Sequence, residues 1–330
     1  MKTVIVGGVA GGASAAARLR RLDEHAQIII FERGEHVSFA NCGLPYYIGG
    51  AIEDKEDLTL QTPESLKARF NIDVRVNSEV TAIDTTAKTV TVKTAAGEVY
   101  SESWDKLILS PGAKPVIPNI PGVDSKLVFT LRNIPDAQKI KEHIISRGPK
   151  SAVIAGGGYI GVELAENLAF AGLDVTIVEL ADHIIAPLDF DMAADVHNYI
   201  RSKGIGLILG NGVSAIEESD GGLTVKLQSG EIKADFLVMA VGVKPDTEFV
   251  RAAGIATNSR GSIIVDDHMR TNVSDVYAVG DAVEIRDFIT GTPAFIPLAG
   301  PANRQGRIAA DNIAGVDSSY GGTQGSAVLK

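Results

Sequence analysis

The sequence predicts an α/β fold in which one parallel-sheet domain is inserted within another. Two observations lead to this expectation. A strand, a glycine-rich turn, a helix and a second strand follow one another twice, from Lys2 and from Ser151, and a further strand and turn over residues 276–281 comes after the second unit has closed. Strands that alternate with helices favour parallel sheets covered on both faces. The 330 residues, 45% of them apolar and 22% charged, suffice for two hydrophobic cores.

The first unit opens with a strand expected over residues 2–6 and a turn over residues 7–12, GGVAGG. A helix is expected over 13–22 and a second strand over 27–31, which ends at Glu32. Glycines let a pyrophosphate approach the backbone, the helix N-terminus offers unpaired N–H groups, and the carboxylate can accept hydrogen bonds from a ribose diol. The spacing therefore indicates a nucleotide-binding unit.

The second unit repeats this order with a complete G-x-G-x-x-G pattern at residues 156–161. Its strands are expected over 151–155 and 174–178, its helix over 162–171, and its acidic strand end is Glu179. One such unit is a weak signal, but two in register, each followed by an acidic residue, make coincidence unlikely. Two units imply two nucleotides.

The remaining elements suggest the domain boundaries. Prolines at 115, 118 and 121 punctuate the passage 114–122, as expected of a connection between domains. We therefore expect one domain over 1–118 and 244–330 and a second over 119–243. The other elements are a β-rich insertion over 74–76, 80–83 and 89–93, strands over 106–109 and 235–241, and a late helix over 299–314.

Composition excludes several classes of function. The formal charge of −10 argues against broad nucleic-acid binding. Met1 leads straight into a strand, and no apolar run reaches the roughly 18 residues of a membrane span, so we expect no membrane partner and a cytoplasmic protein. None of the six histidines has a metal-like spacing, and no metal site is predicted.

The single cysteine, Cys42, lies ten residues after Glu32 in the stretch SFANCGLPYY. It can form neither an internal disulfide nor a cysteine-cysteine zinc site. We favour a redox role over an inert core thiol. A lone cysteine must borrow its second sulfur from a substrate or form a sulfenic acid or persulfide. A helix start over 43–47, with Pro45 in its first turn, would lower the pKa of the thiol.

At this point the chain resembles the flavin-dependent pyridine nucleotide-disulfide oxidoreductases, in particular their single-cysteine branch of coenzyme A-disulfide reductases, NADH oxidases, NADH peroxidases and persulfide or polysulfide reductases. The resemblance rests on GGVAGG at 7–12, SFANC at 38–42, GGGYIG at 156–161, AVGDA at 278–282 and PLAGPANR at 297–304. It implies two Rossmann-like domains, with the NAD domain inserted in the FAD domain. SFANC is most similar to the coenzyme A-disulfide and polysulfide reductases.

Three departures qualify the resemblance. The peroxidase branch carries a histidine where this chain has Ala10, which disfavours a peroxidase. Val9 stands where the strict fingerprint has its second glycine, although valine fits this branch. Relatives also continue past residues 320–325 into a dimerisation domain, whereas this sequence stops at Lys330. We therefore expect a truncated or unusually short form that lacks this domain; a homodimer is expected for the full-length family.

The resemblance implies FAD in the first unit and NADH in the second. Glu32 would bind the adenosine ribose, Asp281 the ribityl hydroxyls and Glu179 the ribose of NADH; a carboxylate there, followed by Leu180 and Ala181 instead of arginine, favours NADH over NADPH. The implied catalytic residues are Cys42, a gating Tyr159 and an acidic Glu163. The implied cofactor-binding residues are Gly7, Gly8, Ala10, Gly11, Gly12, Glu32, Arg33, Asn41, Val80, Ser110, Gly112, Gly156, Gly158, Tyr159, Ile160, Gly161, Glu179, Gly242, Gly280, Asp281, Leu298 and Ala299.

Coenzyme A, as bound thiol or substrate, is the expected small-molecule partner. Arginine pairs one turn apart, Arg18 with Arg21 and Arg304 with Arg307, can meet its phosphates or simply face water. The implied substrate-binding residues are Arg18, Arg21, Ser38, Phe39, Asn41, Asn303 and Arg307. The leading function is an FAD- and NADH-dependent reductase of coenzyme A disulfide, coenzyme A persulfide or polysulfide. The alternatives are an NADH oxidase that uses a Cys42 sulfenic acid and a flavin-binding electron carrier without turnover of its own.

Overall fold

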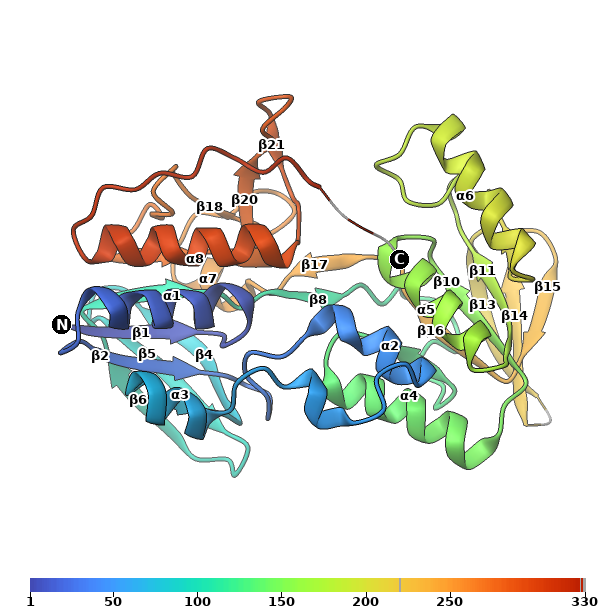
Figure 1. Ribbon diagram of the computed structural model, residues 1–330, viewed down its shortest axis with the longest axis horizontal. Coiled ribbons are helices and arrows are strands. Elements are labelled where there is room, and N and C mark those ends of the chain that lie inside the picture. Colours follow the sequence, from blue (N-terminus) through green and yellow to red (C-terminus); the bar gives the residue numbers. More distant parts are fainter. Residues whose placement is uncertain (220, 327, 329–330) are drawn as a thin grey trace. The chain divides into compact units, whose positions relative to one another are not determined.

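The computed structural model describes residues 1–219, 221–326 and 328, which form two compact units. Unit 1 comprises Met1–Phe39, Thr59–Lys114 and Lys244–Val328, and unit 2 comprises Ala40–Leu58 and Pro115–Val243. Figure 1 labels most of the elements of each unit. The sequence analysis placed residues 40–58 in the first domain, whereas these residues pack within unit 2, because helix α2 (Leu44–Gly49) contacts helices α4 (Ile134–Arg147) and α5 (Tyr159–Phe170).

Unit 1 is built on a five-stranded parallel sheet. Its order is β19 (Val276–Ala278), β7 (Lys106–Leu109), β1 (Lys2–Val6), β2 (Gln27–Phe31) and β3 (Asp73–Arg75). In register, Val4 of the central strand lies beside Ile29 on one side and Leu107 on the other. The return of the chain to this sheet through β19 was expected from the strand and turn over 276–281.

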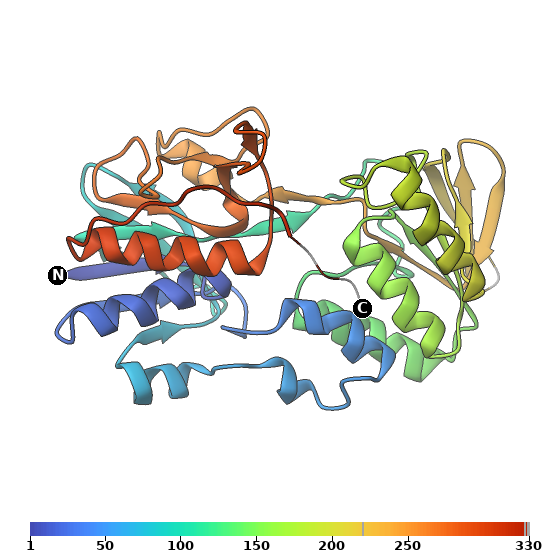
Figure 2. The same ribbon diagram turned by 45° about the horizontal axis from the view of Figure 1, so that its top comes forward.

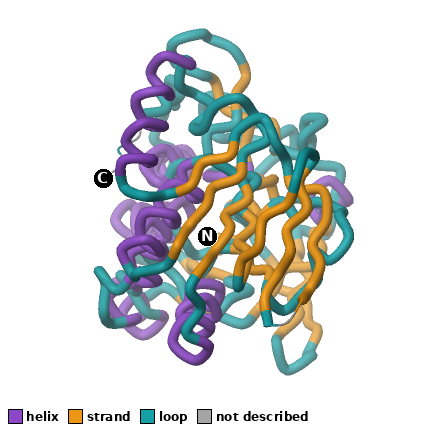
Figure 3. Tube along the Cα trace, turned by 90° about the vertical axis from the view of Figure 1, so that its right-hand side faces the viewer, coloured by secondary structure: helices purple, strands orange, loops and turns teal. Residues whose placement is uncertain are grey.

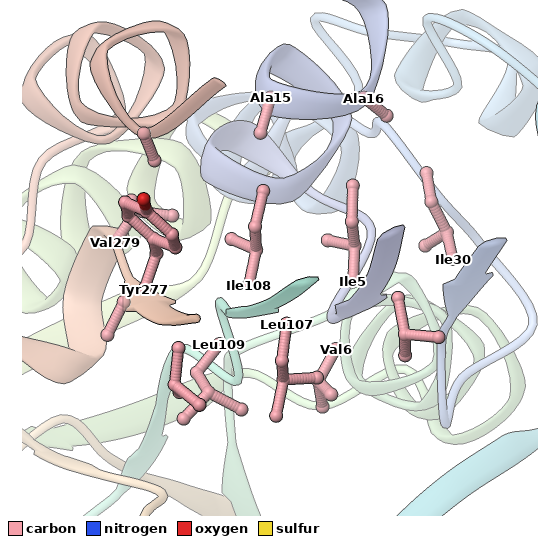
Figure 4. Packing of buried hydrophobic residues seen from close by; sticks show 14 of the residues in the cluster. Ile5, Val6, Ala15, Ala16, Ile30, Leu107, Ile108, Leu109, Tyr277 and Val279 are labelled. Atoms are coloured by element: carbon pink, nitrogen blue, oxygen red, sulfur yellow. The ribbon is translucent and has the colours of Figure 1, made fainter. Parts of the chain in front are cut away.

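Helices α1 (Ala10–Leu22) and α8 (Ala299–Ile313) lie side by side along this sheet (Figures 1 and 2). Their close approach requires Gly306, where an added Cβ would lie 2.3 Å from the carbonyl oxygen of Gly11. Figure 4 shows Ala15 and Ala16 of α1 above Ile5 and Ile108 of the strands. Strands β1, β2, β7 and β19 are apolar along most of their length, as expected of a parallel sheet that is covered on both faces.

Smaller elements complete unit 1. Strands β4 (Ser78–Asp84), β5 (Thr89–Thr94) and β6 (Val99–Ser103) form an antiparallel sheet, which agrees with the strands expected over 80–83 and 89–93, whereas the strand expected over 74–76 is β3 of the parallel sheet. Strands β18 (Ile263–Ile264), β20 (Val283–Arg286) and β21 (Pro293–Ala294) form another sheet. The short helices are α3 (Pro63–Phe70), α7 (Glu248–Ala252) and the 3₁₀ turn η3 (Gly280–Ala282).

Unit 2 repeats the architecture with a second five-stranded parallel sheet. Its order is β12 (Gly206–Ile208), β11 (Asp174–Val178), β10 (Ser151–Ala155), β16 (Phe236–Met239) and β9 (Val128–Thr130). Helices α2, α4, α5 and α6 (Phe190–Ser202) accompany it, and strands β13 (Val213–Ser219), β14 (Gly222–Leu227) and β15 (Glu231–Ala234) form an antiparallel sheet. Figure 3, coloured by secondary structure, shows strands gathered in sheets with helices alongside.

The chain passes between the units at β8 (Ala113–Pro115) and β17 (Val243–Pro245), which pair with each other. The first of these lies at the start of the proline-rich passage. Within the described ranges, no helix is long and apolar enough to cross a membrane.

Both nucleotide-unit helices begin three residues earlier than expected. α1 starts at Ala10 and α5 at Tyr159, so the last glycines of each turn belong to the helix. The reason is packing: a Cβ on Gly12 would lie 1.9 Å from the carbonyl oxygen of Gly7, and one on Gly161 would lie 2.0 Å from that of Gly156. Such glycines serve close packing of helix on strand, which propensity alone cannot reveal.

Candidate functional site

The first glycine turn is held by Glu32, at the carboxyl end of β2. The carboxylate accepts the N–H of Gly8 at 2.9 Å through Oε2 and the N–H of Gly34 at 2.9 Å through Oε1. Gly7 has a φ of +94°, and a Cβ there would lie 2.0 Å from the carbonyl oxygen of Ser110. Only glycine fits this conformation and this contact.

The second turn repeats this arrangement around Glu179. Its Oε2 accepts the N–H of Gly157 at 2.6 Å and its Oε1 the N–H of Ala181 at 2.8 Å. Gly156 has a φ of +110°, with Ala240 in the place of Ser110. A carboxylate offers about four lone-pair sites, so each glutamate that holds its turn retains acceptors for the two hydroxyls of a ribose.

The two turns differ at the residue that precedes each helix. Val9 precedes α1 and Gly158 precedes α5, and neither helix has an acidic residue in its first turn or a side-chain cap in the described structure. Their first-turn N–H groups and positive dipole ends therefore suit an anion. Around Gly158, the described residues leave open space within 4 Å of an ideal Cβ, so a pyrophosphate could approach the backbone, whereas Val9 has a side chain there.

A further group of residues surrounds the first turn within unit 1. A Cβ on Gly11 would lie 2.9 Å from Ser110 Oγ and 2.9 Å from a methyl carbon of Val279. Gly280, with a φ of +80°, donates its N–H to Oε1 of Gln305 at 2.7 Å. The structure therefore brings Ser110 and Gly280 close to the turn, and Asp281 follows Gly280 in the chain; their roles at an FAD site stay predictions. Sequence reasoning missed the buried Gln305, because nothing local marks an amide on α8 as the partner of the turn that follows β19.

The other predicted residues of the first site have varied surroundings. Gly112, with a φ of +72°, accepts the N–H of Asp246. Leu298 precedes α8 and Ala299 begins it. The side chain of Val80 is buried in the core of unit 1, so any contact that it makes with a ligand must come from its backbone. The roles of Gly112, Leu298, Ala299 and Val80 in binding a cofactor stay predictions.

Arg33, beside Glu32, belongs to a charge cluster in unit 1. It pairs with the buried Asp246, whose other oxygen accepts from Lys114 at 2.9 Å; Lys114 also pairs with Glu248 at 2.9 Å. Burial opposes ionisation of Asp246, but hydrogen bonds from Lys114 and Arg33 outweigh it and lower the pKa of Asp246. The segment that follows Glu32 is thereby fixed to the start of α7.

Cys42 lies in the 3₁₀ turn η1 (Asn41–Gly43) that leads into α2, and its side chain is exposed. Pro45 occupies the first turn of α2, as expected. The Oδ1 atom of Asn41 is buried without a hydrogen-bond partner among the described residues. A buried acceptor in this state is a candidate for a ligand's donor group.

Acidic and phenolic groups surround this part of unit 2. Burial, and then the charges of Glu163, Glu166 and Cys42, raise the pKa of Tyr46. Burial, and then Glu166, raise the pKa of Glu163. Both shifts favour the neutral, protonated forms. Sequence reasoning selected Glu163 but missed Tyr46, four residues after the cysteine.

The contact between helices α2 and α5 brings Tyr46 and Glu163 together. A Cβ on Gly49 would lie 2.8 Å from the Cβ of Asn167, whose side-chain amide donates to the carbonyl oxygen of Glu163 at 2.8 Å. Tyr159 and Ile160 open α5 and are half-buried. Gly242, with a φ of +109°, accepts the N–H of Val116 at 2.9 Å.

Some of the predicted coenzyme A residues of unit 1 are already engaged with other side chains. On α1, Ser14 donates to Asn303 Oδ1 at 2.7 Å and Arg18 Nε donates to Asp311 at 2.7 Å, both of them on α8. Arg21 is exposed and lies 5.6 Å over the ring of Phe70.

Arg304 and Arg307 are exposed on α8. Ser38, with a φ of +47°, donates its N–H to the carbonyl oxygen of Gly8 at 2.9 Å, and Phe39 bridges to Thr59. In the part of the chain that the structure describes, no group of three or more His, Cys, Asp or Glu side chains could hold a metal ion.

Comparisons with known proteins agree with this geometry. The family model described as pyridine nucleotide-disulphide oxidoreductase matches residues 1–306. The coenzyme A disulfide reductase of Staphylococcus haemolyticus (strain JCSC1435) is 37% identical over 317 residues, which are 95% of this chain and 70% of that protein.

Two solved structures are similar over 100% of this chain. Reduced Bacillus anthracis CoADR-RHD is 50% identical, with a TM-score of 0.97 and 59% of its chain covered. A NAD-dependent persulfide reductase from A. fulgidus is 35% identical, with a TM-score of 0.96 and 62% of its chain covered. This chain therefore spans less than two thirds of either solved chain. The two carboxylate-held glycine turns, the lone cysteine and these matches together show that the chain belongs to the pyridine nucleotide-disulphide oxidoreductase family, whose members are enzymes that bind FAD and NAD(P)H.

Proposed function

We propose that this chain is an NADH-dependent, FAD-containing reductase of coenzyme A disulfide, coenzyme A persulfide or polysulfide, with Cys42 as the redox-active thiol. The observation that carries the proposal is the exposed position of this single cysteine in the 3₁₀ turn that leads into α2, near Tyr46, whose pKa is raised by burial and then by the charges of Glu163, Glu166 and Cys42. Relatives named as coenzyme A disulfide reductase and persulfide reductase support the choice of substrate class.

The chain connection limits how far the thiol can lie from the first turn. The N–H of Ser38 is bonded to Gly8, and Cys42 follows Ser38 by four residues. An extended chain covers about 3.5 Å per residue, so the Cα atoms of Ser38 and Cys42 cannot be more than about 14 Å apart. The thiol is therefore tethered to the turn that we assign to FAD.

The residues present fit both cofactors. The first turn, Glu32, Ser110 and Asp281 would hold FAD, and the second turn with Glu179 would hold NADH. When bound, FAD would take hydride equivalents from NADH and pass two electrons to sulfur. A carboxylate at position 179 disfavours the 2′-phosphate of NADPH.

Cys42 would act as a thiolate nucleophile. Its sulfur attacks one sulfur of coenzyme A disulfide, so a Cys42–coenzyme A disulfide forms, the substrate disulfide breaks, and one coenzyme A thiolate leaves and takes a proton. Two electrons that originate from NADH then cleave the mixed disulfide, which restores the Cys42 thiolate and releases the second coenzyme A thiol. With one further proton, NADH and one disulfide yield NAD⁺ and two thiols.

Neighbouring groups would assist this chemistry. Tyr46 keeps its proton and would donate a hydrogen bond to a thiolate, and the N-terminus of α2 favours negative charge on Cys42. Arg21, Arg304 and Arg307 are exposed, and we propose them for coenzyme A phosphates, whereas Arg18 must share its charge with Asp311. Asn41 would offer its buried acceptor to the substrate or flavin.

Steady-state turnover of the FAD-loaded protein tests the proposal. We expect NADH oxidation to depend on coenzyme A disulfide or polysulfide, to consume little oxygen, and to be lost in Cys42→Ser. An artificial one-electron acceptor such as ferricyanide is the control, because its reduction needs only NADH and flavin and should survive the substitution. Oxygen consumption that accounts for all NADH would instead indicate an oxidase, and ferricyanide reduction without any disulfide turnover in the unaltered chain would indicate a carrier.

A further inference from the structure

The segment between β11 and α6, residues 180–189, packs against the second glycine turn. Ile185 donates its N–H to the carbonyl oxygen of Gly157 at 2.8 Å. A Cβ on Gly157 would lie only 2.4 Å from a methyl carbon of Ile184, and both isoleucines are buried. Gly157 is also the residue whose N–H holds Glu179. The position of the turn therefore depends on Ile184 and Ile185.

This segment is held in a strained conformation. Ile185 has a φ of +53°, in the left-handed region that a β-branched residue rarely adopts. Such a residue persists only where its surroundings determine its conformation. On the C-terminal side of Ile185, the N–H of Leu188 donates to the carbonyl oxygen of Ile185 at 2.8 Å. On the N-terminal side of Ile185, the N–H of Ile184 donates to Nε2 of His197 at 3.3 Å.

His197 is nearly fully buried on α6, with 4% of its surface exposed. Because Nε2 accepts a hydrogen bond, the ring must be neutral with its proton on Nδ1. The ring of Phe190 packs edge-on against both His197 and His183, at 6.4 and 6.2 Å between centroids. From the sequence, the histidines were noted only for lacking a metal-like spacing.

The charged surroundings favour the neutral form. Burial, then Arg201 and His183, lower the pKa of His197, and Asp182 opposes them; Asp182 itself is bonded to Nδ1 of His183 at 2.6 Å. The ring is therefore neutral at pH 7.5. Acidification places a second donor, Nε2–H, opposite the N–H of Ile184, so the contact is lost.

We propose that His197 is a positioning residue for the dinucleotide site of unit 2: its neutral ring holds Ile184 and Ile185, and through them Gly157 and Glu179, in the geometry that binds NADH. The inference rests on the proposed function, because it assigns NADH to this turn. It adds a pH dependence of cofactor binding that does not involve Cys42. NADH affinity falls when the pH drops through the lowered folded-state pKa of His197. The folded chain loses stability as the pH falls from the unfolded-state pKa toward that lower value, because the unfolded chain takes up the proton first.

Binding of NAD⁺ to the FAD-loaded full chain, measured by isothermal titration calorimetry at pH 7.5 and 5.5, tests the inference. His197→Leu keeps the volume but leaves the Ile184 N–H unpaired, and we expect about tenfold weaker binding at pH 7.5 with unchanged FAD content. His197→Gln restores an acceptor that does not titrate, so its affinity should approach that of the unaltered chain and no longer fall at pH 5.5. His143→Leu is the matched control, because His143 packs on Phe129 and Phe236 and does not contact residues 180–189 among those described.

Two results would overturn the inference: folded His197→Leu that binds NAD⁺ as tightly as the unaltered chain, or unaltered affinity that is the same at both pH values. If His197→Leu fails to fold, the glutamine variant and the pH series of the unaltered chain still decide. If the unaltered chain binds no NAD⁺ at either pH, the assignment of this turn in the proposed function is wrong, which is a different result from a binding site that ignores His197.

Discussion

Alanine substitutions at two glycines separate the two roles of the second turn, which are close packing against helix α5 and binding of the cofactor's pyrophosphate. A Cβ on Gly161 would lie 2.0 Å from the carbonyl oxygen of Gly156, so Gly161→Ala forces α5 away from the turn even in the free protein. Gly158 has a φ of −75° and open space around its Cβ position. Gly158→Ala therefore fits the free protein, and the methyl group meets only a bound pyrophosphate.

The magnitudes follow from overpacking. An extra methyl in a filled space costs about 1 to 3 kcal/mol. For Gly161→Ala this lowers the melting temperature by about 2 to 12 °C. For Gly158→Ala the same cost arises only in the complex, so NADH binding weakens about 5- to 150-fold. The folded state of that variant changes by less than about 1 kcal/mol.

Thermal unfolding of the FAD-loaded protein and titration with NADH measure both quantities. Gly321→Ala is the control, since Gly321 lies outside both turns with open space around its Cβ position among the described residues. It should change neither quantity. Gly158→Ala that binds NADH like the unaltered chain, or Gly161→Ala that unfolds at the unaltered temperature, would refute the reasoning.

Three further predictions address charge. Replacing Glu179 by Ala and Leu180 by Arg should shift the ratio of kcat/KM values toward NADPH by at least about tenfold, since a repelling carboxylate is exchanged for a phosphate ligand; an unchanged ratio would contradict the assignment of Glu179. Because burial and Glu166 raise the pKa of Glu163, the change Glu166→Gln should move any Glu163-dependent limb of the pH–rate profile to lower pH, and Glu163→Gln should abolish that limb. Asp246→Asn should lose about 1 to 3 kcal/mol of unfolding free energy at pH 7. The folded-state pKa of Asp246 is lowered, so this stabilisation is present above the unfolded pKa of about 3.9 and is lost as pH falls below it; a difference between variant and unaltered chain that stays constant down to pH 2 would count against the charge cluster.

What could be predicted from sequence was local. Gly7, Gly156, Glu32 and Glu179 stand at fixed spacings within one strand–turn–helix–strand unit, so the order of elements and the carboxylate at each strand end followed from periodicity and glycine chemistry. The return of the chain to the first sheet was also predictable, because the strand at 276–278 is apolar and is followed by a turn that contains Gly280.

What could not be predicted depends on contacts between distant residues. Gln305 meets Gly280 only because α8 lies on α1, and Tyr46 meets Glu163 only because α2 packs on α5. The same packing places residues 40–58 in unit 2 although the chain enters them from unit 1. The hydrogen bond from Ile184 to His197 joins the segment before α6 to α6 itself, and no sequence motif indicates it.

The central claim, that Cys42 is the redox partner of the bound flavin, is tested most directly by an anaerobic titration of the FAD-loaded protein with NADH, followed by visible absorption. The account predicts a long-wavelength charge-transfer band from the Cys42 thiolate to the flavin that is absent in Cys42→Ser, while both proteins still undergo bleaching by NADH. Bound flavin that bleaches with the same spectrum in both proteins would contradict it.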